Sequence, residues 1–128
     1  MSRVLARGWA TVELDRAETE LHGLVGGAGF QEVERCSWLG ARCRRARAIP
    51  SEAVAGEWIV LLEADAEGRL AAFLARHGEG WAATWAIEAG AHPTRDPKPG
   101  PLGPEILVPG LPTSGPFRLL VTAATIDP

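Results

Sequence analysis

The chain of 128 residues has no tyrosine, one methionine, two cysteines and no long apolar run. No stretch approaches the roughly 18 apolar residues that a membrane-spanning helix requires. Residues 1–7 lack the apolar core of a signal peptide, so we expect a cytoplasmic location and no membrane partner. The net charge of −3 gives no broad basic surface for a phosphate backbone, so we expect no nucleic-acid partner.

The two cysteines, Cys36 and Cys43, flank a tight turn expected at Leu39 and Gly40. A hairpin centred there would set the two thiols opposite each other. Such a pair could oxidise, although a reducing cytoplasm favours two free thiols. Since no histidine lies near them, they predict no zinc site.

Five tryptophans are the most unusual feature that is present. Each indole buries a large area and brings a single N–H donor. The hydrophobic share of 46% and the length fit one domain with a substantial core. The tryptophans therefore either belong to that core or line a ligand cavity.

The first half of the chain predicts one helix among four strands. Asp15 and Glu18 have the spacing of a capping box, and Gly26 with Gly27 would end the helix that follows. Alternating or continuous apolar residues predict strands over residues 9–14, 30–36, 41–49 and 58–62. The expected order is β-α-β-β-β.

The second half predicts a helix and then shorter strands. Asp65 would cap a helix with Leu70, Phe73 and Leu74 on its apolar face, ending at Gly78. A strand is expected from Trp81. Residues 92–116 hold most of the prolines, which leaves room only for short strands near 105–108 and 117–122.

A weak internal repeat links the two halves. Residues 8–11 (GWAT) resemble residues 84–87 (TWAI), and residues 59–62 (IVLL) resemble residues 117–120 (FRLL). The second half is therefore interpreted as the same unit without its helix.

Residues 59–64 (IVLLEA), followed by residues 68–80 (GRLAAFLARHGEG), resemble the vicinal oxygen chelate superfamily. The nearest-looking branch holds glyoxalase-like proteins and methylmalonyl-CoA epimerases, which commonly show IELLEP, then AKFLEKRGEG, then GLHHIAF. The resemblance implies a single α+β domain over 1–128, in which two βαβββ modules form curved mixed sheets around a pocket. Module one would span about 3–64, the linker helix about 65–78 and module two about 81–126.

In active members of that superfamily, His, Glu or Gln side chains bind a divalent metal in the pocket. Here the family's ligand positions fall on Val60, on Ala83, on Arg7 or Gly8, and on Arg118 or Leu119, depending on register. None of these side chains can bind a hard divalent ion. We therefore expect no metal and no other cofactor.

Strand alternation then suggests what replaces the metal. If Trp85 faces the cavity, residues two apart share its face, and the repeat places Trp9 opposite. The candidate ligand-binding residues are Trp9, Trp85, Val60, Leu62, Ala83, Ile87 and Leu120. Both tryptophans could instead pack in the core beneath a helix.

Arg7 and Arg118 are the candidate catalytic residues, because two neighbouring cations would hold an anionic group of a ligand. Alternatively, they are solvated residues at strand ends. Arg44, Arg45 and Arg47 are interpreted as the solvated face of an edge strand. Glu13, Glu63 and Glu88 are general-base candidates that the sequence does not rank.

Three functions remain open. The first is metal-independent binding of a hydrophobic or aromatic small molecule, such as a secondary metabolite, for sequestration or transport. The second is a metal-free cyclase, isomerase or lyase acting on a hydrophobic biosynthetic intermediate such as a polyketide. The third is a pseudo-enzyme with a structural role. The resemblance also leaves a homodimer open.

Overall fold

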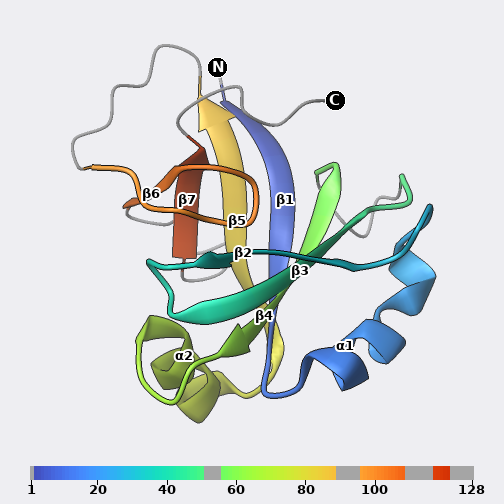
Figure 1. Ribbon diagram of the computed structural model, residues 1–128, viewed down its shortest axis with the longest axis horizontal. Coiled ribbons are helices and arrows are strands. Elements are labelled where there is room, and N and C mark those ends of the chain that lie inside the picture. The colour runs from blue at the N-terminus through green and yellow to red at the C-terminus, as the bar shows by residue number, and fades with distance from the viewer. Residues whose placement is uncertain (1, 51–55, 89–95, 109–116, 122–128) are drawn as a thin grey trace.

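One curled sheet of seven strands carries the fold (Figure 1). The computed structural model describes residues 2–50, 56–88, 96–108 and 117–121. The strands are β1 (Ser2–Thr11), β2 (Gln31–Cys36), β3 (Ala41–Arg47), β4 (Trp58–Ala64), β5 (Gly80–Glu88), β6 (Glu105–Val108) and β7 (Phe117–Val121). The helices are α1 (Leu14–Glu20), the 3₁₀ turn η1 (His22–Leu24) and α2 (Arg69–His77).

The strand order β2-β3-β4-β1-β5-β7-β6 repeats one pattern twice. In the first half, β1 pairs parallel with β4, and β4 pairs antiparallel with β3. In the second half, β5 pairs parallel with β7, and β7 pairs antiparallel with β6. The antiparallel pair β1–β5 joins the halves. This confirms the α+β class and the two related modules; no helix occurs between β5 and β6 in the described residues 96–104.

The sheet curls until its two edge strands face each other. Cys36 of β2 donates its S–H to Glu105 of β6, and the indole N–H of Trp38 donates to the Glu105 carbonyl. Because β2 and β6 are at opposite ends of the strand order, these bonds can form only across the concave side. The concave side is therefore an interior.

The structure corrects the repeat by one residue. Val60 and Leu62 share their buried cluster with Leu119 and Val121, whereas Leu120 and Arg118 alternate to the other face of β7. A slip of one residue moves every side chain of a strand to the opposite face. The short matches in the sequence showed that a repeat exists but aligned its last strand in the wrong register.

Helix α1 packs on the convex face. Leu14, Ala17 and Leu21 form a second buried cluster with Ile59 and Leu61 of β4. The helix begins after Glu13, not after Asp15 as expected. The reason is that Glu63 accepts the Leu14 backbone N–H and thereby satisfies one of the free donors at the helix start.

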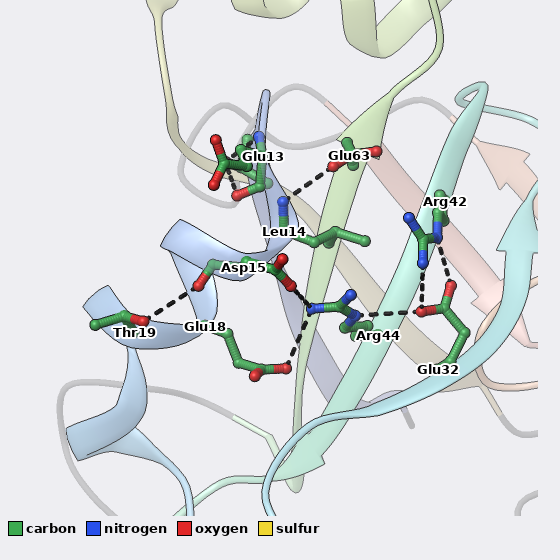
Figure 2. Close-up of polar contacts among 10 residues, drawn as sticks. Glu13, Leu14, Asp15, Glu18, Thr19, Glu32, Arg42, Arg44 and Glu63 are labelled. Carbon is green, nitrogen blue, oxygen red and sulfur yellow. Dashed lines mark hydrogen bonds and ion pairs between the residues drawn. The ribbon is translucent and has the colours of Figure 1, made fainter.

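The two acidic residues expected to cap α1 bind an arginine instead. Figure 2 shows Arg44 of β3 between Asp15 and Glu18 on one side and Glu32 of β2 on the other. Arg42 also binds Glu32, but its side chain is more exposed. Arg44 thus links α1 to the sheet and is not merely part of a solvated face.

The remaining elements follow the expected order with shifted ends. The first strand covers Ser2–Thr11 instead of 9–14, and α2 begins at Arg69, with Leu70 buried and Phe73 and Leu74 packed on the core. Cys36 pairs across the hairpin with Ala41, so the cysteines are not opposite each other, and both are free and buried. No helix in the described part of the chain is long and apolar enough to span a membrane.

We predict that Arg44→Met lowers the free energy of unfolding by about 1 kcal/mol, because it removes bonds to carboxylates on two elements. Arg42→Met is the matched control and should cost less, since Arg42 is exposed and, among the described residues, pairs with Glu32 alone. Urea unfolding at low and high salt measures both. Equal losses for the two variants would contradict the role given to Arg44.

Candidate functional site

The concave interior is filled by the protein's own side chains. Trp85 is fully buried and its ring lies over Gly8: a Cβ at residue 8 would be 2.6 Å from the indole. Val60, Leu62 and Ala83 are buried in the same cluster, and Ile87 packs at its margin. The structure therefore brings together five of the seven expected ligand-binding residues. They form packed core around the Trp85 indole and do not line an open cavity.

Of the positions where the sequence resemblance implies metal ligands, Val60, Ala83 and Leu119 lie in the main buried cluster and Gly8 contacts Trp85 there, so these four face the interior. These four residues have no side-chain donor for a metal. The Trp85 ring also occupies the space that a ligand from residue 8 would need. The residues present do not fit the family's metal.

Other donors do not replace that set. Within the described ranges, no group of three or more His, Cys, Asp or Glu side chains could hold a metal ion.

Glu105 is a buried polar residue of the interior, and no local pattern in the sequence marks it as a site residue. Its carboxylate accepts the indole N–H of Trp85 at 2.8 Å and the thiol of Cys36 at 3.0 Å. Burial raises the pKa of Glu105 to about 7, against the opposing effect of these two bonds. Burial also raises the pKa of the Cys36 and Cys43 thiols. A carboxyl that takes up its proton near neutral pH therefore lies among tryptophan and thiols.

Residues 96–104, here called the strap, close the concave side over Glu105. Gly100 is buried, and a Cβ there would lie 1.9 Å from a carboxylate oxygen of Glu105. The Pro99 carbonyl accepts the Ser37 N–H, and the Pro101 carbonyl accepts a guanidinium N–H from Arg45. Leu102 is buried in the main cluster. The strap is thus fixed to both the rim and the floor of the interior.

An open pocket of about 230 Å³ remains beside Trp58, at the end of the concave face. We call it the mouth pocket. The Arg45 and Arg47 guanidiniums lie 4.5 and 4.1 Å from the centre of the Trp58 ring. Its lining residues are Gly26, Gly27, Ala28, Gly29, Gln31, Val33, Arg45, Ala46, Arg47 and Trp58.

Sequence reasoning missed the mouth pocket because it took Trp58 as part of a buried strand and the arginines as solvated. Alternation would have placed Arg45 and Arg47 on one face of β3. Pairing with Trp58, however, depends on the register of β3 with β4, which sets Arg47 opposite Trp58. The register was not legible from the sequence.

Trp9 lies on the convex face, which contradicts the expectation that it faces Trp85 and agrees with the alternative that it packs in the core beneath a helix. It packs in the second cluster and meets Trp81 edge to face at 5.2 Å. Arg7 lies over the Trp81 ring at 4.5 Å, and burial lowers the pKa of its guanidinium. The one-residue slip in the repeat explains the misplacement.

The two candidate catalytic arginines share a row on the convex face. Arg7 pairs with Thr84, and Thr84 pairs with Arg118, so one strand separates the arginines. Leu120 alternates to the same side of β7. The structure thus brings Arg7 and Arg118 near each other, but on the face opposite Trp85. Their role in catalysis stays a prediction.

A further pocket of about 500 Å³ lies between α1 and the loop before β2. It shares Ala28 and Gly29 with the mouth pocket, so this loop separates the two. Its acidic lining residue Glu18 is already bound to Arg44. Its acidic side chain is therefore less available to a ligand than the arginines of the mouth pocket.

We predict that stability falls as the pH rises through the pKa of Glu105. A carboxyl whose pKa is raised from 4.5 to about 7 in the folded state binds its proton more tightly when folded. Its stabilisation is complete below the unfolded pKa and lost between about pH 5 and about pH 8, amounting to about 3 kcal/mol. Urea unfolding of the wild type and Glu105→Gln across this range measures the difference. Parallel pH profiles would refute the prediction.

Gly8→Ala should lower the free energy of unfolding by about 1–3 kcal/mol, because the added methyl overlaps the Trp85 ring. Gly80→Ala is the matched control, since a Cβ at Gly80 meets nothing within 4 Å. The double variant Gly8→Ala/Trp85→Phe should be more stable than the sum of the single effects, as measured by denaturant unfolding. Additive losses would show that residue 8 and Trp85 do not compete for space.

No protein-family model matches the chain, and no curated protein matches it significantly. Among solved structures, it is similar to a methylmalonyl-CoA epimerase in complex with methylmalonyl-CoA and NH4+, with a TM-score of 0.69, 18% identity, and 99% and 98% of the two chains covered. A Streptomyces coelicolor methylmalonyl-CoA epimerase variant with 2-nitronate-propionyl-CoA gives a TM-score of 0.68, 18% identity and coverage of 96% and 98%. A Mycobacterium tuberculosis methylmalonyl-CoA epimerase gives a TM-score of 0.59, 19% identity and coverage of 93% and 86%. With its repeated strand pattern and half-barrel sheet, the chain has the vicinal oxygen chelate fold.

Proposed function

We propose that this protein binds a small hydrophobic or aromatic molecule, without a metal ion, in the mouth pocket. The observation that carries the proposal is the arrangement of Trp58, Arg45 and Arg47 around an open space at the end of a filled interior. Indole and guanidinium groups are flat and pack well on flat ligands. A volume of about 230 Å³ suits a ring or a short acyl group rather than a drug-sized molecule.

Two features support this function. The family's metal positions lack donor side chains, so a ligand has to be held by packing and polar contacts alone. Two of the similar structures are complexes with CoA esters, which gives this fold a precedent for small-molecule binding. A role in sequestering or carrying a secondary metabolite, a cytoplasmic location and a homodimer belong to the same proposal.

Metal-free isomerisation or cyclisation is the second candidate, and Glu105 favours it. A carboxyl with a pKa of about 7 is suited to give and take a proton near neutral pH. Glu105 is fully buried beneath Gly100, however, so a substrate would reach it only after the strap moved. We therefore place binding first.

The test is calorimetric titration of the EDTA-treated protein with naphthalene-2-carboxamide, a flat uncharged probe. We expect saturable binding that Trp58→Leu weakens about tenfold or more, because the indole wall is lost. Trp9→Leu is the matched control: Trp9 is also a half-buried strand tryptophan with a buried, unpartnered N–H, but on the convex face. It should leave binding unchanged.

Other results would point elsewhere. Loss of binding in Trp9→Leu alone would move the site to the convex face. Equal loss in Trp85→Phe and Trp58→Leu would show that the ligand reaches the interior. A stoichiometric divalent ion after mild purification would overturn metal independence, and a rearranged compound recovered from metabolite extracts would favour catalysis.

A further inference from the structure

The mouth pocket concentrates positive charge on one face of β3. Arg47 is directly opposite Trp58 across the β3–β4 pair, and Arg45 is opposite Val60 in the next row of the same face. Both guanidiniums contact the same indole, at 4.5 and 4.1 Å from its centre. Two like charges are therefore held close together within a chain whose net charge is −3.

This charge is poorly compensated by the protein itself. The hydrogen-bond partner of Arg45 is the neutral Pro101 carbonyl, at 2.9 Å, and no described carboxylate pairs with its guanidinium. Burial, followed by the charge of Arg47, lowers the pKa of Arg45. Among the described residues, the carboxylate that pairs with Arg47 is that of Glu57, at 3.8 Å, which Arg3 shares at 3.6 Å. Arg44 on the opposite face differs, since three carboxylates surround it.

A third donor in the same place is unused. The indole Nε1 of Trp58 is buried, and no described residue accepts its hydrogen. A buried donor without a partner costs free energy that a ligand acceptor would recover. Gly27 and Gly29 line the same pocket, and a Cβ at either residue would meet nothing within 4 Å, so this part of the pocket has free space.

We propose that the ligand of the mouth pocket is an organic carboxylate, with its carboxylate between Arg45 and Arg47 and accepting from Trp58 Nε1. This rests on the proposed function and names its ligand class. Arg guanidinium groups match a planar carboxylate in shape and charge, and an indole N–H adds direction. The carboxylate replaces the missing counter-charge, while the apolar body of the ligand packs against Trp58 and Val33.

The test compares two probes of the same shape by calorimetry: 2-naphthoate and the uncharged naphthalene-2-carboxamide. We expect the carboxylate to bind about tenfold or more tightly, as charge-assisted hydrogen bonds imply. High salt should reduce this ratio because it screens a partly exposed pair of cations. Arg45→Met should bring the ratio close to one. Arg42→Met, on the same strand but outside the pocket, should not change it.

The outcomes distinguish a failure of the carboxylate proposal from a failure of the proposed binding function. Equal binding of both probes, still weakened by Trp58→Leu, would overturn the carboxylate and leave the binding function intact. Failure of both probes to bind would refute the binding function. If Arg45→Met does not fold, the probe ratio and its salt dependence in the wild type decide alone.

Discussion

The contact of the Trp85 indole with Gly8 is the constraint on which the rest of this molecule depends. The ring lies where a side chain from β1 would enter the interior, so that strand must carry a glycine. The ring N–H donates a hydrogen bond to Glu105, and Glu105 accepts a second one from the thiol of Cys36, at the opposite edge of the sheet. Through Glu105, one side chain on β5 is therefore linked to both edges of the curled sheet.

Closing the centre has an electrostatic consequence. Burying a carboxylate without a cation costs free energy, and burial therefore raises the pKa of Glu105 to about 7, so that the group takes up a proton at a pH where an exposed glutamate is fully charged. The strap adds a cover that only a glycine at position 100 allows. The interior is thus closed over Glu105, whereas Arg45 and Arg47 line the open mouth pocket.

The sequence was sufficient for the architecture but not for the site. Periodicity and the resemblance over residues 59–80 predicted the α+β class, the two modules, the linker helix and the short strand at Glu105–Val108, and the structure and its neighbours confirm them. Alternation also grouped Ala83, Trp85 and Ile87 correctly, because residues two apart on a strand share a face whatever the register.

Register explains most of the errors. Trp9, Arg118 and Leu120 were placed on the wrong face by a slip of one residue, which short apolar matches such as IVLL and FRLL cannot detect. Glu105 and Trp58 were missed because their partners are distant in the sequence: Cys36 and Trp85 for one, Arg45 and Arg47 for the other. Contacts across a curled sheet leave no local pattern.

The pairing of Gly100 with Glu105 also limits which substitutions this protein tolerates. A Cβ at position 100 would occupy the volume of the Glu105 carboxyl, so a larger residue there is compatible with the closed strap only if residue 105 becomes smaller as well. Two positions that are five residues apart in the sequence are therefore constrained to change together.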